Sequence, residues 1–163
     1  VIEPAPAIKL NRYLKNGGTI FFDTRDSSGG GVGADRLEEI ARHLDVPPMT
    51  AIPSDHVLTK AYYLLREFPG RWTGGRVWVQ RSTSQAAERA NDGVSSIIVG
   101  GHDWAGAWAM DEARKPLYPV VPGGERQREM AYRFGINLMM YVLTGNYKAD
   151  QVHLPAILER LGQ

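Results

Sequence analysis

Short apolar runs alternate with longer amphipathic stretches along this chain. Two runs, residues 19–22 and 97–99, consist of β-branched and aromatic residues without polar alternation. Such runs are typical of strands that are buried on both faces of a parallel sheet. Residues 76–80 alternate in polarity like a half-exposed strand, and a short strand is expected around residues 50–52.

Apolar residues recur at helical spacing in the stretches between these strands. The first helix is expected to end at Asn16-Gly17-Gly18 and the longest at Gly145-Asn146, because glycine and asparagine favour the left-handed conformation that closes a helix. The predicted helices cover residues 8–15, 34–44, 56–65, 125–144 and 155–162. Strands that alternate with helices predict an α/β fold, a three-layer α/β/α sandwich with a mostly parallel sheet.

Composition narrows the class of protein. The length of 163 residues suits one domain, and we expect residues 1–163 to form it. The net charge is +1, with 19 basic and 18 acidic side chains and no basic run, so nucleic acid is not an expected partner. The absence of cysteine excludes disulfides, thiolate metal sites and cysteine nucleophiles. No run of about 18 apolar residues is present, so no segment is expected to span a bilayer.

The chain begins at Val1 without an initiator methionine. We therefore expect it to be a piece of a longer polypeptide. A helix opens the chain and its strand follows, which suggests that a preceding strand belongs to the missing part.

Polar side chains follow both buried runs at their carboxyl ends, where ligands bind in open parallel sheets. If the two strands are neighbours, the side chains from both ends face one crevice. We expect this convergence and place the binding site there. The residues concerned are Asp23, Arg25 and Asp26 after the first strand, and His102, Asp103 and Trp104 after the second.

Three roles are open to these side chains. Carboxylates and imidazole suit a divalent ion, but the adjacent His102 and Asp103 bind a single ion poorly and no ligand spacing is present, so we predict no metal. As a catalytic pair, His102 and a carboxylate, Asp23 or Asp103, would transfer a proton near neutral pH. In the structural alternative, both aspartates form hydrogen bonds with loop backbone, and His102 is a partly buried polar side chain whose hydrogen bonds are satisfied.

The glycine-rich segment 27–33 follows a strand and opens a helix, as in a dinucleotide-binding motif. Gly31-Val32-Gly33 lacks the third glycine, because Arg36 stands at that position, and the loop is longer than a phosphate-binding turn. We therefore predict no cofactor. A loose anion-binding loop and a flexible surface loop both remain open for this segment.

Trp104 and Trp108 are four residues apart and share one helical face. Tryptophan pairs of this kind either stack on sugar rings or pack in the core. Trp72 and Trp78 are expected to be structural.

The longest helix carries a polar pair, Arg133 and Asn137, again four residues apart. This pair either reaches a pocket or forms hydrogen bonds with another element. His56, in the first turn of its predicted helix, is a further candidate for the crevice.

Four segments together resemble a bacterial domain family of unknown function. They are "LNRYLKNGGTIFFDTRD", "SDHVLTKAYYLL", "SSIIVGGHDWAGAWAMD" and "MAYRFGINLMMYVLTGNY". The resemblance covers about Leu10 to Tyr147, and the family occurs at the C-terminus of large membrane-anchored proteins whose N-terminal region is similar to aerotolerance-operon proteins. It implies a flavodoxin-like, class I glutamine amidotransferase-like fold, similar in outline to trehalose-utilisation-type domains.

The resemblance implies a site at the strand ends but no amidotransferase activity, because that reaction needs a cysteine nucleophile and the chain has none. The chain departs from the family pattern at Val57, where proline is expected, and in its longer glycine loop. The motif positions that carry over are Asp23, His56, His102, Asp103, Trp108, Arg133 and Asn137.

These observations predict a ligand-binding or interaction domain that is not an amidotransferase and belongs to a bacterial cell-envelope protein. The parent protein is expected in the inner membrane and this domain in the periplasm, with a small-molecule or envelope ligand as partner. Two alternatives remain. One is a hydrolase of carbohydrate or cell-wall material that uses His102 with Asp23 or Asp103, and the other is a purely structural module.

Overall fold

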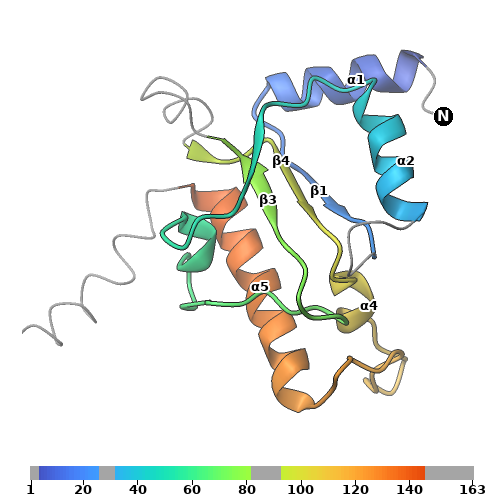
Figure 1. The fold of residues 1–163 in the computed structure, drawn as a ribbon, viewed down its shortest axis with the longest axis vertical. Helices are drawn as coiled ribbons and strands as arrows, with labels where there is room; N and C mark the ends of the chain where they lie inside the picture. Colours follow the sequence, from blue (N-terminus) through green and yellow to red (C-terminus); the bar gives the residue numbers. More distant parts are fainter. Residues whose placement is uncertain (1–3, 26–31, 82–92, 146–163) are drawn as a thin grey trace, which may run out of the picture.

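The computed structural model describes residues 4–25, 32–81 and 93–145. These residues form four α-helices, one short 3-10 helix and four strands (Figure 1). The helices are α1 (Pro4–Lys15), α2 (Val32–Ala41), η1 (Val57–Thr59), α4 (Trp104–Trp108) and α5 (Glu125–Thr144). The strands are β1 (Ile20–Asp23), β2 (Met49–Ala51), β3 (Trp78–Gln80) and β4 (Ile97–Gly100).

The four strands form one mixed sheet in the order β1-β4-β3-β2. Strands β1 and β4 are parallel, with Asp23 opposite Gly100 at their carboxyl ends. Strand β3 is antiparallel to both β4 and β2. The α/β class is confirmed, but the prediction of a mostly parallel sheet is wrong. Parallel neighbours need a crossover, usually a helix, and the stretch between β2 and β3 does not build the helix predicted at 56–65.

That predicted helix is replaced by the short η1, so this prediction is wrong as well. Beyond η1, the backbone N–H groups of Tyr62 and Tyr63 donate to Oδ1 of Asn137, at 3.2 and 2.8 Å. The carbonyls of Leu58 and Tyr63 accept from its Nδ2, at 2.9 and 2.8 Å. A side chain of α5 therefore binds backbone groups that a continuous helix would have paired within itself, and this tertiary contact overrides the local helical pattern.

Helix α5 confirms the prediction for residues 125–144. Its buried stripe includes Phe134, Leu138 and Tyr141, and at its end Gly145, with φ of 57°, donates its backbone N–H to the Tyr141 carbonyl. The helix predicted at 155–162 lies outside the described residues. No helix in the described ranges combines the length and apolar character needed to cross a membrane.

One face of the sheet forms the hydrophobic core with α4 and α5. Phe21, Ile98 and Val79 are cross-strand neighbours on this face, and Ile98 and Val79 are completely buried. Above them, Trp104 of α4 stacks on Phe134 of α5 with ring centroids 4.3 Å apart. Because burying one large apolar side chain contributes about 1.5–3 kcal/mol, this layer contributes strongly to the stability of the domain.

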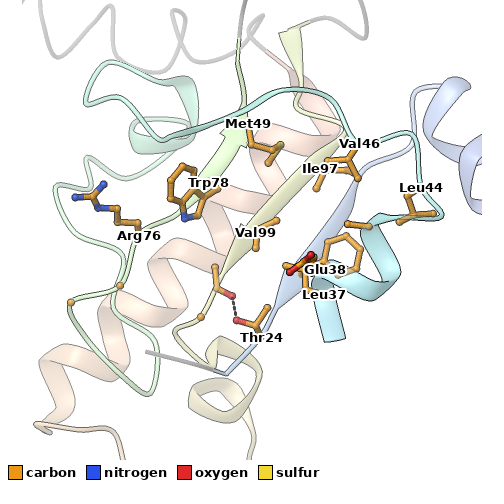
Figure 2. A pocket seen from close by; sticks show the side chains of 16 residues that line it. Thr24, Leu37, Glu38, Leu44, Val46, Met49, Arg76, Trp78, Ile97 and Val99 are labelled. Atoms are coloured by element: carbon orange, nitrogen blue, oxygen red, sulfur yellow. Dashed lines mark hydrogen bonds between the residues drawn. The ribbon is translucent and has the colours of Figure 1, made fainter. Parts of the chain in front are cut away.

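The opposite face of the sheet is only partly covered. Phe22, Val99 and Trp78 are cross-strand neighbours there. Helix α2 lies on this side and places Leu37 near these residues, whereas α5 runs behind the sheet (Figure 2). Trp78 remains 40% exposed. The sheet thus separates a closed core layer from a partly open apolar face.

Tyr141 connects α5 to the start of β4, and its replacement by phenylalanine should reduce stability. The buried hydroxyl accepts from the Ser95 backbone N–H at 2.7 Å and donates to the Gly93 carbonyl at 3.1 Å. Tyr141→Phe leaves both groups without this partner, so we expect a loss of about 1–3 kcal/mol in the free energy of unfolding, measured by urea denaturation. Tyr132→Phe is the control, since its longer hydroxyl contact of 3.4 Å is only partly buried. Equal losses in the two variants would contradict this account.

Candidate functional site

The two predicted clusters do meet, because β1 and β4 are neighbours. Asp23 ends β1 beside Gly100, and its carboxylate accepts backbone N–H groups from Asp103 at 2.9 Å and Ala105 at 3.0 Å. Burial raises the pKa of Asp23, and the charge of Asp103 acts in the same direction, while the backbone donors oppose it. Asp23 thus holds the start of α4 in place. Asp26 lies outside the described residues.

Asp103 is the N-cap of α4 and adopts a left-handed conformation with φ of 53°. Its carboxylate accepts from the Gly106 backbone N–H at 3.2 Å. It also pairs with Arg71 at 3.2 Å and lies 3.7 Å from the largely exposed Arg25. Its acceptor sites are therefore occupied by the fold, as the structural alternative requires.

His102 is almost completely buried, with 2% of its surface exposed. Its ring packs on Trp104 with centroids 4.3 Å apart, and a Cβ added at Gly75 would lie 2.8 Å from its Nε2. Burial lowers the pKa of the imidazole. Its Nδ1 finds no hydrogen-bond partner among the described residues. The lowered pKa disfavours the protonated imidazole near neutral pH, and little of the ring surface is exposed.

The two tryptophans of α4 pack against α5. Trp104 is fully buried against Phe134 and Phe21, so no face of its ring is open to a sugar. Trp108 donates its indole N–H to the Ala131 carbonyl at 2.8 Å. A Cβ added at Gly135 would lie 3.0 Å from the Trp108 ring, so glycine there permits the close approach of this side chain to α5.

His56 and the polar pair of α5 lie away from the strand ends. His56 caps η1, with Nδ1 accepting from the Leu58 backbone N–H at 3.1 Å, and burial lowers its pKa to about 4. Arg133 pairs with Glu129 and lies over the Tyr63 ring at 4.9 Å. Asn137 is completely buried, and its amide forms hydrogen bonds with backbone groups of residues 58–63.

A pocket of about 600 Å³ lies against the partly covered face of the sheet (Figure 2). The sheet contributes Phe22, Val99 and Trp78 to its lining, and α2 contributes Leu37 and Ala41. The lining is mainly apolar. The described structure thus contains a binding-sized space that the sequence analysis had not located.

At the carboxyl ends of the strands, backbone groups line the pocket, and none of the described candidate side chains does. Gly100 and Gly101 line it, together with Thr24, whose hydroxyl donates to the Gly100 carbonyl at 3.4 Å (Figure 2). A Cβ at Gly100 would collide with the Trp104 ring, so packing already requires glycine there. The described candidates absent from the pocket lining are Asp23, Arg25, His56, His102, Asp103, Trp104, Trp108, Arg133 and Asn137.

A signal for this pocket was present in the sequence. Residues 76–80 alternate, and a tryptophan stands at Trp78 on the half-exposed face of that strand. Trp78 continues an apolar row with Val99 and Phe22, and contiguous exposed apolar patches mark binding surfaces. The structure places Trp78, which was expected to be structural, in the pocket lining with 40% of its surface exposed.

A second pocket, of about 660 Å³, shares Gly74, Gly75 and Arg76 with the first. His102 lines it, as does Glu67. His102 is thus the one predicted site residue among those described that borders either pocket.

No group of three or more metal-ligating side chains is arranged to hold an ion within the described ranges. A family model for a domain of unknown function, DUF4159, matches residues 1–143. No curated protein matches the chain.

Proposed function

We propose that this chain, which belongs to the DUF4159 family of domains of unknown function, is a ligand-binding domain. Its ligand is a small, largely apolar molecule held between α2 and the partly covered face of the sheet. The observation that carries this function is the pocket of about 600 Å³ with an exposed tryptophan in its lining. Ligand pockets typically have this size and an apolar lining with few polar groups.

The energetics favour an apolar ligand. Phe22, Val99 and Trp78 form a continuous row across three strands, and α2 adds Leu37 beside them. Removing apolar surface from water contributes about 25 cal/mol per Å². A molecule that covers this row would therefore gain affinity without any charged group.

The arrangement of Asp23, His102 and Asp103 at the carboxyl ends of β1 and β4 gives little support to a hydrolase. Asp23 and Asp103 accept backbone N–H groups, and Asp103 also pairs with Arg71. His102 packs on Trp104 with 2% of its surface exposed, and it borders the second pocket. A general acid–base pair needs both groups within hydrogen-bond reach of the substrate, and neither Asp23 nor Asp103 lines the pocket that His102 borders. Binding is therefore the function we propose.

The proposed setting of this domain is the bacterial cell envelope. The resemblance to C-terminal domains of membrane-anchored bacterial proteins supports a place in a cell-envelope protein, with this domain on the periplasmic side. The ligand would then be a small molecule or envelope component. The amidotransferase-like character of the fold rests on the same resemblance.

Trp78→Ala should weaken the binding of neutral apolar probes, because it removes the exposed tryptophan ring of the pocket. We expect at least a tenfold loss of affinity for 2-naphthamide, equivalent to about 1.4 kcal/mol, measured by titration of the labelled protein in NMR. The backbone amide signals of Leu37, Val99 and Gly101, which line the pocket in both proteins, report binding there.

Tyr62→Ala is the matched control, because Tyr62 is 49% exposed and does not line the pocket. This variant should bind the probe as the wild type does. Probe binding that Trp78→Ala leaves unchanged would refute the proposed function.

A further inference from the structure

Arg76 and Trp78 lie on the same side of the chain where it enters β3. Arg76 and Trp78 are exposed. Val77, which lies between them, and Val79, which follows Trp78, are only 1% and 0% exposed. In extended chain, residues two positions apart are separated by about 6.6 Å and point to the same face. An arginine and a tryptophan therefore follow each other on one face of the chain, and both residues line the pocket.

The two charged side chains in the pocket lining do not pair with each other. They are Glu38 and Arg76, which lie at opposite ends in Figure 2. Glu38 already pairs with Arg42 at 2.9 Å. Arg76 makes no ion pair with any residue that the structure describes. Among the described residues, the lining charge without an ion-pair partner is therefore positive.

Arg76 stands at the rim, with its guanidinium directed away from Trp78 in Figure 2. It does not stack on the indole ring, in contrast to Arg71 on Trp72 at 4.7 Å. Its exposed side chain is free to meet an anionic group at the mouth of the pocket, and a guanidinium binds carboxylates with two parallel N–H donors.

From this juxtaposition we infer that the ligand is an amphipathic carboxylate. Its apolar body lies on Trp78 and Val99, and its carboxylate reaches Arg76 at the rim. This inference rests on the proposed function, because it names the class of molecule that the same pocket binds.

Three matched probes test the inference on the full chain: 2-naphthoate, 2-naphthamide and 2-naphthylmethylammonium. They share one ring system and differ in charge. We expect the carboxylate to bind about fivefold more tightly than the amide, and the ammonium most weakly, because an exposed ion pair contributes at most about 1 kcal/mol. Arg76→Met, which keeps much of the side-chain length, should remove this preference and leave amide binding unchanged.

Arg66→Met is the control variant, since Arg66 lines the second pocket and not the first. It should retain the preference for the carboxylate. Equal binding of the three probes to the wild type, or a preference that survives Arg76→Met, would overturn the carboxylate assignment and leave the proposed function standing. Failure of all three probes to bind would overturn both.

Discussion

Replacing Asn137 by leucine is expected to lower the free energy of unfolding by about 4 kcal/mol. The amide makes four hydrogen bonds to backbone groups of Leu58, Tyr62 and Tyr63, and the side chain has no exposed surface. Leucine has a similar volume but leaves two N–H groups and two carbonyls without this partner. Each lost bond costs about 1 kcal/mol, and more where water cannot replace the partner.

Urea denaturation followed by circular dichroism measures the loss, and Asn11→Leu is the matched control. Asn11 also bridges two backbone groups, accepting from Asp45 at 2.9 Å and donating to the His43 carbonyl at 3.2 Å, but these bonds are exposed. Water can replace them, so we expect a loss below about 1 kcal/mol.

Asn137→Asp is the second variant, for use if the leucine variant is too unstable to purify. It distinguishes the contribution of the two donor contacts of the amide from that of its two acceptor contacts. A carboxylate keeps the two acceptor contacts but turns an oxygen toward the carbonyls of Leu58 and Tyr63. This variant should lose stability as pH rises through the titration of the new carboxyl. Similar stabilities for Asn137→Leu and Asn11→Leu would show that the buried amide does not support the loop.

Acidification from pH 7.5 to 4.5 is expected to destabilise the fold through His56. Its pKa falls from 6.5 to about 4 because the ring is buried, and the smaller effect of the Asp55 charge opposes the shift. Below pH 6.5 the unfolded chain therefore binds a proton that the folded chain still excludes. Stability falls as pH decreases through this window, by about 3 kcal/mol in total. Burial lowers the pKa of His102 too, so this residue acts in the same direction.

His56→Asn isolates this contribution. Asparagine keeps a side-chain oxygen that can accept the Leu58 N–H and cap η1, but it does not titrate. The free energy of unfolding at each pH, from urea denaturation, should fall less steeply for this variant than for the wild type. His43→Asn removes an exposed histidine and should keep the wild-type slope. A His56→Asn variant with the full acid loss would exclude His56 as the source.

Part of the site was predictable because strand-end residues of adjacent strands must lie close together. Asp23 and Asp103 meet as expected. Their roles were not predictable in the same way, because whether a carboxylate faces a cavity or a backbone N–H depends on how α4 begins. Asp103 caps α4 in a left-handed conformation, and the carboxylates of both Asp23 and Asp103 accept backbone N–H groups at the start of α4.

The sequence by itself determined the elements whose signals are local. The 3.6-residue apolar pattern and Gly145 define α5, and the run before Asp23 defines β1. Tertiary structure decided the direction of β3, the loss of the helix at 56–65 and the position of the pocket. Asn137 lies 75 residues from Tyr62, whose backbone it binds. Such contacts form between segments far apart in the chain, and no local pattern records which backbone groups a distant side chain will bind.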